Sequence, residues 1–171
     1  MYIFSQSIQV PMTYKSLIAF GVVFTLAAPA QAQEFVASLS GWDLRSGANA
    51  ALLLEVHGKP RWDYGWVQLG LGAAAGADTE GSAWIGGGVV AEAPLSNRWF
   101  VEASVMPGYY HPGTPQADLG SDFEVRSLLG LGYRFDNGNA LSVAAGHLSN
   151  ASISNLNPGA NGILLRYHRS F

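Results

Sequence analysis

The chain has 171 residues, a formal net charge of −3 and no cysteine. The lack of cysteine excludes a disulfide framework, a thiolate metal site and a cysteine nucleophile. Lys59 is the only lysine after the first 32 residues, and this mildly acidic balance argues against a nucleic-acid-binding surface. The chain is also 49% hydrophobic, rich in glycine and only 12% charged, which is unusual for a soluble domain of this size.

The N-terminal segment has the features of a secretory signal peptide. Lys15 precedes an apolar run, and Ala30-Gln31-Ala32 matches the small-x-small pattern at which signal peptidase cuts. The run is too short for a transmembrane helix, which needs about 20 apolar residues. We therefore expect residues 1–32 to be removed, with Met12 a candidate for the true start, and residues 33–171 to form one domain.

The rest of the sequence alternates between apolar and polar or small residues, with the period of two that is typical of β-strands. No helical period of 3.6 residues competes with this pattern. We expect about eight strands. They are Glu34 to Asp43, Asn49 to His57, Trp62 to Ala75, Ser82 to Ala93, Arg98 to Gly108, Phe123 to Phe135, Ala140 to Leu148 and Asn161 to Phe171.

The alternation separates an apolar face from a face of charged and small residues. In the segment 123–135 one row is Phe123, Val125, Leu129, Leu131, Tyr133 and Phe135, and the other is Glu124, Arg126, Gly130, Gly132 and Arg134. The inside of an eight-stranded barrel is just wide enough for side chains, so small residues with matched acids and arginines suit it, provided that the charges pair. The pattern predicts an all-β fold, an eight-stranded antiparallel transmembrane β-barrel. A soluble lipocalin-like carrier with the apolar row inside is the alternative.

Loop lengths and aromatic residues agree with an outer-membrane barrel. The turns at 95–97 and 136–138 are short and the connections 111–122 and 149–160 are long, and such barrels alternate short and long connections. All tryptophans after the signal segment lie near predicted strand ends, as an interfacial girdle requires. They are Trp42, Trp62, Trp66, Trp84 and Trp99. Phe171 closes the last strand with an aromatic, which is typical of outer-membrane barrel proteins.

His147 and Ser149 place an imidazole and a hydroxyl two residues apart on one expected strand. Side chains with this spacing share a face, here the apolar, lipid-facing row. An imidazole facing hydrocarbon needs a partner for its nitrogens, and a histidine beside a serine is the minimal pair for base-activated attack on an ester. Asn161 begins the next strand on the same outward row, so strand pairing would bring it beside His147 as a third member.

Three features stand together near the C-terminus: His147-Leu148-Ser149-Asn150 at the end of the penultimate strand, an Asn157-Pro158-Gly159 loop, and a short last strand with a terminal aromatic. With these features in a signal-bearing barrel of this length, the chain resembles the lipid A 3-O-deacylases of the PagL type, most closely from Gly146 to Tyr167. The resemblance implies an outer-membrane esterase that removes the 3-hydroxyacyl chain from position 3 of lipid A.

The resemblance also implies roles for the residues of the motif. Ser149 would be the nucleophile and His147 the base. The best-known members of the family have a glutamate fourteen residues after the histidine, where this chain has Asn161. An asparagine can orient a catalytic histidine, but it brings no negative charge to stabilise the imidazolium. Asn150, next to the nucleophile, is expected to help bind the oxyanion together with backbone amides of the loop.

The expected partners are lipid A in lipopolysaccharide, as substrate, and the lipid of the outer membrane. No nucleic acid is expected, and a homodimer is left open. No metal or other cofactor is expected, since the histidines show no zinc spacing; they are His57, His111, His147 and His168. Two further alternatives are a non-catalytic small barrel with a structural or adhesive role and an esterase of the same family that acts on another lipid.

Overall fold

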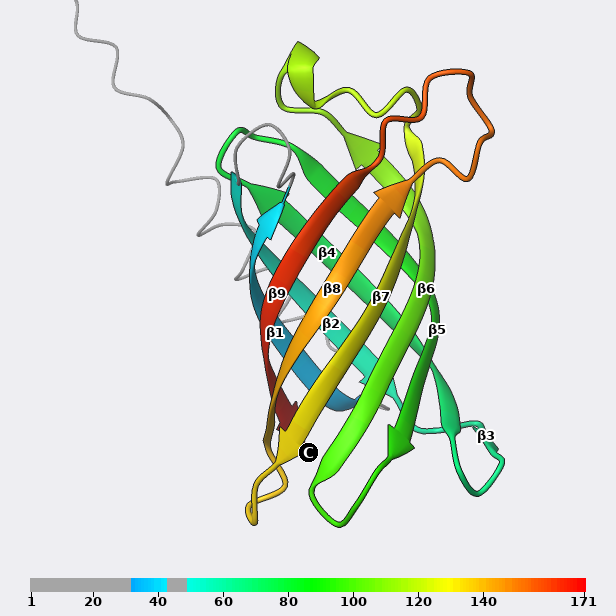
Figure 1. Cartoon of the computed structure of the whole chain (residues 1–171), viewed down its shortest axis with the longest axis vertical. Helices are drawn as coiled ribbons and strands as arrows, with labels where there is room; N and C mark the ends of the chain where they lie inside the picture. The colour runs from blue at the N-terminus through cyan, green and yellow to red at the C-terminus, as the bar shows by residue number, and fades with distance from the viewer. Residues whose placement is uncertain (1–31, 43–48) are drawn as a thin grey trace, which may run out of the picture.

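The structure, a computed structural model, describes residues 32–42 and 49–171. Eight long strands form a closed antiparallel barrel (Figure 1). They are β1 (Ala32–Trp42), β2 (Asn49–Gly58), β4 (Gln68–Asp78), β5 (Ala83–Pro94), β6 (Trp99–His111), β7 (Phe123–Arg134), β8 (Ala140–Ser149) and β9 (Ala160–Ser170). β9 pairs with β1, and β2 pairs with β4, which closes the barrel and confirms the expected fold class.

Two smaller elements lie outside the wall strands: β3 (Trp62–Asp63) and the 3₁₀ turn η1 (Pro115–Ala117). No helix in the described ranges is long and apolar enough to cross a membrane. Apart from Ala32, the expected signal peptide, residues 1–32 with Met12, lies outside the described residues.

The barrel has two distinct ends (Figure 1). β1 begins and β9 ends at the same end, where the Phe171 N–H donates to the Gln33 carbonyl at 3.0 Å. We call this the terminal end and the opposite one the loop end. The expected long connections, now 112–122 and 150–159, lie at the loop end, and the short turns 95–98 and 135–139 lie at the terminal end.

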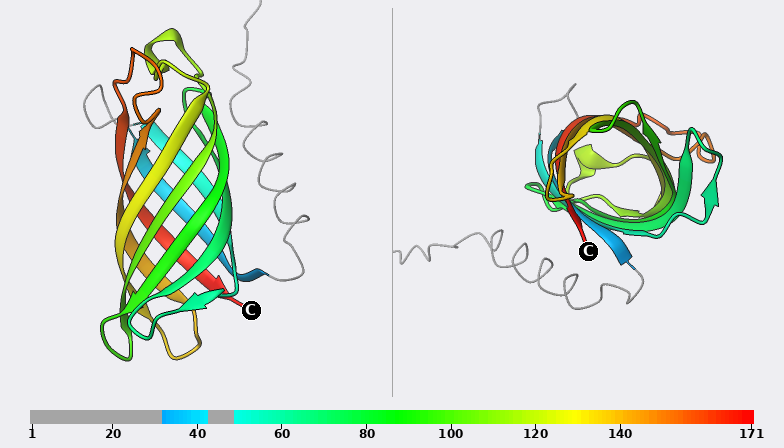
Figure 2. Two further views of the ribbon diagram at one scale, coloured as in Figure 1. Left: turned by 90° about the vertical axis from the view of Figure 1, so that its right-hand side faces the viewer. Right: turned by 90° about the horizontal axis from the view of Figure 1, so that it is seen from below.

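The segment from Trp62 to Ala75, expected as one strand, is two elements. β2 pairs with β4 only as far as His57 and Gly72. β3 pairs with Gln68 and Leu69 at the foot of β4, on the edge that β2 leaves free. The resulting hairpin, residues 59–67, projects outward from the barrel wall at the terminal end (Figures 1 and 2). Because of this hairpin, the connection between β2 and β4 is long, whereas the expected alternation of connection lengths requires a short connection at the terminal end.

The two faces of the wall are as the alternation predicts. In β8, Leu141, Val143 and Ala145 are exposed, whereas the residues between them are buried. The strands β1, β4, β5, β6, β7 and β9 share this exposed apolar surface through Leu39, Leu71, Ile85, Val89, Val105, Leu129, Leu131, Ile163 and Leu165. An apolar outside and a charged inside suit lipid around the barrel. The soluble carrier, which needs its apolar row inside, is therefore excluded.

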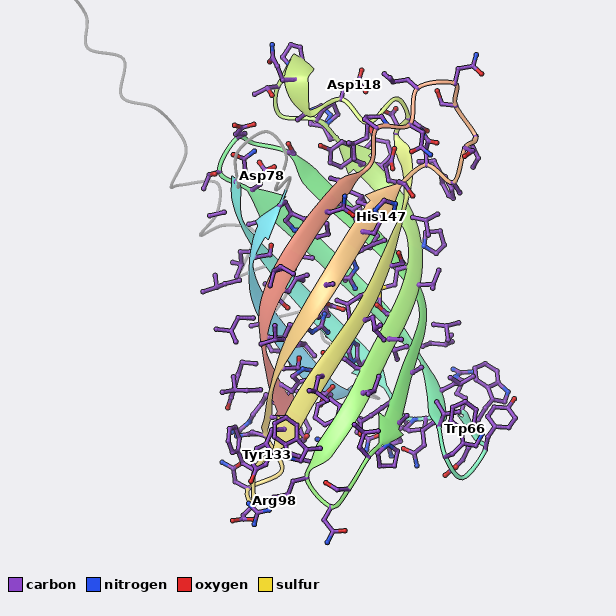
Figure 3. All side chains as sticks on the ribbon, viewed as in Figure 1. Trp66, Asp78, Arg98, Asp118, Tyr133 and His147 are labelled. Atoms are coloured by element: carbon purple, nitrogen blue, oxygen red, sulfur yellow. The ribbon has the colours of Figure 1, made fainter. Side chains whose placement is uncertain are left out.

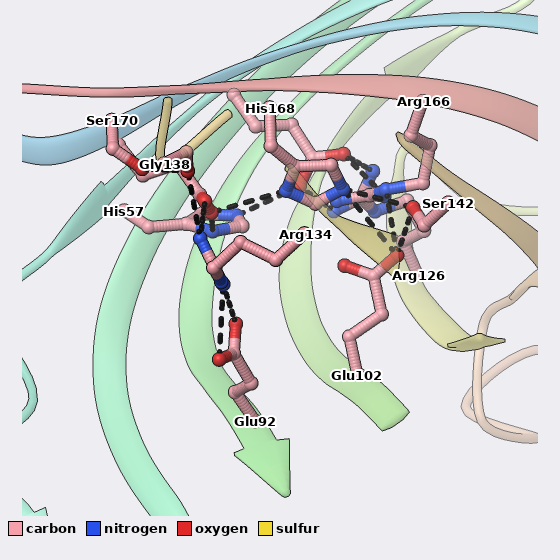
Figure 4. A network of polar contacts seen from close by, with 12 residues as sticks. His57, Glu92, Glu102, Arg126, Arg134, Gly138, Ser142, Arg166, His168 and Ser170 are labelled. Atoms are coloured by element: carbon pink, nitrogen blue, oxygen red, sulfur yellow. Dashed lines mark hydrogen bonds and ion pairs between the residues drawn. The ribbon is translucent and has the colours of Figure 1, made fainter. Parts of the chain in front are cut away.

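Charged side chains in the lumen pair across strands that are far apart in the sequence (Figure 4). Glu55 accepts two hydrogen bonds from Arg126, at 2.8 and 2.7 Å, and one from Arg166 at 2.8 Å. Glu102 accepts one from Ser142 at 2.5 Å. Toward the terminal end the network continues through Glu34, His57, Glu92, Arg134 and His168. This pairing offsets the cost of removing the charges from water.

Glu124 is an exception to the expected pairing. Its side chain is fully buried, and both carboxylate oxygens lack a hydrogen-bond partner among the described residues. Arg126 shares its strand face but turns to Glu55 and lies over the ring of Trp84, 5.3 Å from the ring centre. Among the described residues, the expected pairing of the inner row is therefore not present at Glu124.

Two tryptophans are not part of an interfacial girdle. Trp84 lies inside the barrel with 6% of its surface exposed, and its indole N–H donates to the Glu124 carbonyl at 3.2 Å. A Cβ at Gly108 would stand only 2.7 Å from its ring, so a glycine on the neighbouring strand β6 makes room for it. Trp42 packs against the apolar clusters of the lumen. The girdle expectation is wrong for these two, because their strand positions face inward.

Candidate active site

His147 on β8 and Asn161 on β9 lie directly opposite each other. They are Cα partners in the antiparallel ladder, and His147 points outward near the loop end (Figure 3). Nδ1 of His147 is 2.9 Å from Oδ1 of Asn161. Because an amide oxygen can only accept, Nδ1 carries the proton, and Nε2 of the neutral ring keeps its lone pair. The strand pairing that the sequence predicted between these two residues is present.

The Cε1–Nε2 edge of the His147 ring lies against Gly159, on the side of β9. The ladder between the two strands ends at Leu148 and Ala160, so Ser149 and Gly159 are the next positions along. A Cβ at Gly159 would stand 3.7 Å from Nε2 and 3.0 Å from Cε1 of the ring. No hydrogen bond between Ser149 and His147 is present in the described part of the chain. The ring edge that carries Nε2 faces Gly159, the next position across from Ser149.

Ser127 on β7 is a second hydroxyl beside the imidazole. It is the Cα partner of His147 on the side opposite to Asn161. Ser127, His147 and Asn161 thus form one polar line across three strands of an otherwise apolar wall. The ring leans away from Ser127, since Nδ1 is bonded to Asn161. Sequence reasoning left Ser127 out, although a serine in the outward row of 123–135 was the signal for it.

Asn150 turns to the inside of the barrel instead of toward the lipid-facing site. It is fully buried, and its Nδ2 donates to the carbonyls of Leu119 at 3.2 Å and Leu156 at 2.8 Å. Both amide hydrogens are used in these bonds, so in this arrangement its side chain has no donor for an oxyanion. Asn150 joins the loop after β8 to the loop after β6.

Asn157 is brought to the start of the loop after β8 by a hydrogen bond that the sequence did not predict. Its Oδ1 accepts the backbone N–H of Asn150 at 3.2 Å. The side chain is exposed, and its Nδ2 makes no hydrogen bond among the described residues. Since Asn150 directly follows Ser149, this amide donor stands close to the serine backbone.

The large cavity of the barrel is separate from this site. A cavity of about 770 Å³ opens at the loop end of the lumen, and Leu148, Gly159 and Ala160 form part of its wall. Leu148 and Ala160 face inward, whereas their neighbours His147 and Asn161 face outward. The candidate site is therefore lateral and open to the lipid around the barrel.

Comparison with known proteins identifies the family. The PagL family model, described as lipid A 3-O-deacylase, matches residues 45–170. The chain belongs to the PagL family. This PagL-family protein is accordingly an enzyme of the outer membrane, a lipid A deacylase, as the motif near its C-terminus indicated. No curated protein matches the chain.

Solved structures share the barrel of this PagL-family protein. The crystal structure of the outer membrane enzyme PagL has a TM-score of 0.65 at 20% identity and covers 81% of this chain and 99% of its own. A de novo designed transmembrane β-barrel has a TM-score of 0.53 at 11% identity, covering 82% and 97%. Neisserial surface protein A has a TM-score of 0.52 at 10% identity, covering 81% and 95%. At these identities the likeness shows the fold.

Proposed function

We propose that this enzyme hydrolyses the ester-linked 3-hydroxyacyl chain at position 3 of lipid A, with Ser149 as nucleophile and His147 as general base. The 2.9 Å contact between Nδ1 of His147 and Oδ1 of Asn161, on a lipid-facing row, carries the proposal. An imidazole whose Nδ1–H is held by an acceptor is fixed in one tautomer and ready to accept a proton at Nε2. Contact with hydrocarbon alone would favour an apolar side chain at this position.

The reaction follows the order of a serine esterase. Nε2 of His147 takes the proton of Ser149 while Oγ attacks the ester carbonyl carbon. The bond from that carbon to the sugar oxygen then breaks, and His147 returns the proton to the departing oxygen, which leaves a 3-hydroxyacyl-enzyme. Water deprotonated by the same histidine releases the 3-hydroxy fatty acid. The bond between serine and histidine forms when substrate is present, as is common for catalytic hydrogen bonds.

Asn161 takes the third place in this mechanism. Its amide oxygen orients the imidazole but lacks the full charge that a carboxylate would offer to the imidazolium. The imidazolium forms in the transition state, so this difference affects turnover more than substrate binding. We expect a variant with a carboxylate at this position to keep or exceed the turnover of the wild type.

For the oxyanion we propose the Nδ2 group of Asn157 together with backbone amides of the same loop. The hydrogen bond from the Asn150 N–H to Oδ1 of Asn157 supports this role, since it orients the free amide donors of Asn157 beside the serine. Asn150, to which the sequence assigned this role, contributes by holding the loop through the Leu119 and Leu156 carbonyls.

The lateral position of the site suits a lipid substrate. We place the terminal end in the periplasm, so the loop end lies level with the outer leaflet, where lipid A resides. The acyl chain would stay along the outer wall, where Leu129, Val143 and Ile163 are exposed, while its ester carbonyl reaches Ser149. The substrate would therefore not need to leave the membrane.

Mass spectrometry of lipid A from cells that express wild type, Ser149→Ala or His147→Ala tests the proposal. Either substitution should lower deacylation by several orders of magnitude, as is typical for members of one catalytic unit. Heat-modifiable migration on a gel should stay as in wild type. Ser127→Ala is the matched control, since this hydroxyl also neighbours His147, and it should retain activity.

Near-normal deacylation by Ser149→Ala would overturn the assignment of the nucleophile. Loss of activity in Ser127→Ala alone would instead assign the nucleophile to Ser127 on β7. Loss of an acyl chain from another position of lipid A would overturn the proposed regiochemistry. Unchanged lipid A in cells with the folded wild-type protein would favour the non-catalytic barrel.

A further inference from the structure

The hairpin of residues 59–67 carries an exposed aromatic surface that the proposed function does not use. Trp62, Tyr64 and Trp66 are 47%, 62% and 74% exposed. They stand on a segment that projects from the barrel wall (Figures 1 and 2). Large aromatic side chains grouped in this way mark a surface that contacts a partner.

The hairpin holds these side chains in a fixed arrangement. The Tyr64 N–H donates to the Val67 carbonyl at 3.0 Å. Asp63 accepts the Gly65 N–H at 2.7 Å and the Gln68 side-chain amide at 3.0 Å. The bond from the Gly65 backbone, with that from Gln68, lowers the pKa of Asp63. Its carboxylate is occupied within the turn, and the three aromatic side chains remain exposed.

The height of the hairpin along the barrel matches that of an aromatic cluster elsewhere on the wall. Trp66 and Tyr133 lie at a similar level near the terminal end (Figure 3). Tyr133 packs edge-on against Trp99, with ring centres 5.1 Å apart, and against Phe135 at 5.7 Å. Clusters of this kind lie at the membrane–water interface of outer-membrane barrels. The hairpin therefore stands at the interface of the leaflet nearest the terminal end.

Charge complements the aromatic residues. Lys59 and Arg61 are both exposed at the start of the hairpin. The neighbouring acid, Asp63, is engaged by the turn. Two cations beside interfacial aromatic rings are suited to bind the phosphate of a lipid headgroup, because the rings occupy the adjoining region where the headgroups meet the acyl chains.

We infer that the hairpin is a binding site for an anionic glycerophospholipid of the inner leaflet. Trp62, Tyr64 and Trp66 insert between headgroups and the upper acyl chains, and Lys59 and Arg61 hold the phosphate. The site lies at the opposite end of the barrel from His147. It does not depend on the proposed catalytic residues.

A depth measurement tests the insertion. The chain has no cysteine, so Tyr64→Cys gives a single attachment point for a nitroxide, and Asn97→Cys in the exposed turn between β5 and β6 is the control. The full protein is reconstituted in vesicles of phosphatidylethanolamine with phosphatidylglycerol. The label at residue 64 should be accessible to oxygen and protected from a water-soluble nickel complex, with the reverse at residue 97. Equal access of nickel to both labels, or spin–spin coupling between two copies at residue 64, would overturn the inference.

Lipid binding tests the headgroup contact. Native mass spectrometry measures the affinity of phosphatidylglycerol for the detergent-solubilised wild type and for the double variant Lys59→Gln/Arg61→Gln. The loss of two basic residues should weaken binding about tenfold to thirtyfold. Arg169→Gln removes an exposed cation near the same end, on β9, and should bind like wild type. An unchanged affinity in a folded double variant, or an equal loss in the control, would overturn the site.

Discussion

Gly159 lies directly against the imidazole of His147, because a Cβ at this position would stand 3.0 Å from Cε1. Gly159 also has a φ of +62°, a backbone conformation that residues with a side chain rarely adopt. The loop before β9 thus brings backbone against the proposed base, and a methyl group there would push the ring.

Gly159→Ala should lower turnover about tenfold to a hundredfold, because small displacements of a catalytic group have effects of this size. Gly138→Ala is the matched control. Gly138 has a φ of +82°, and no described residue lies within 4 Å of a Cβ placed there, so this variant carries the backbone strain alone. Deacylation of lipid A by the two folded variants separates strain from contact. Similar activities in both would show that the contact with the imidazole does not matter.

Asn161 can be replaced to test its place beside His147. Asn161→Ala should reduce turnover sharply, whereas Asn161→Glu should keep or raise it by supporting the imidazolium. Adding His147→Ala to Asn161→Ala should cost little more than His147→Ala alone. Wild-type kinetics in Asn161→Ala would indicate a Ser/His dyad.

Two acidic residues in the lumen, Glu55 and Glu124, are expected to differ in their effect on the stability of the barrel. Glu55→Gln removes the partner of two buried arginines and should destabilise the barrel by about 3–5 kcal/mol, and Arg126→Ala should act similarly. Glu124→Gln should leave stability unchanged or raise it, because no partner within residues 32–42 and 49–171 loses a bond and a buried acid without such a partner is removed. Urea unfolding in lipid vesicles, followed by gel migration, measures both. A destabilisation by Glu124→Gln equal to that of Glu55→Gln would contradict the pairing scheme.

Asn150→Ala should loosen the loop after β8. The substitution leaves the carbonyls of Leu119 and Leu156 without their donor, a loss of about 1–3 kcal/mol for the buried Leu119 carbonyl and a smaller loss for the part-buried Leu156 carbonyl. We expect faster proteolysis within 150–159 and lower turnover in a barrel that still folds. Asn155→Ala, an exposed position of the same loop, is the control for an asparagine lost without these bonds. Equal protease sensitivity in both variants would contradict the anchoring role.

Most of the barrel wall could be predicted from the sequence, because the period of two in a strand is a local property of the backbone. The row from Phe123 to Phe135 therefore indicated both the strand and its lipid-facing side. The foot of β4 could not be predicted in this way. Trp62 to Ala75 continues the alternation, but β2 leaves the edge of β4 beyond Gly72, and β3 folds back onto it. The local sequence pattern of one strand does not determine where its neighbouring strand ends.

The sequence alone placed His147, Ser149 and Asn161 on one outward row, since two of them share a strand and the third opens the next one. Only the tertiary structure decided which hydrogen-bond partners the other polar residues have. Asn150 turns inward to Leu119, 31 residues away, and Glu55 bonds Arg126 across 71 residues instead of leaving it to Glu124. The reason is physical: the face of a side chain follows from its own strand, but its partner depends on the register of strands joined only when the barrel closes.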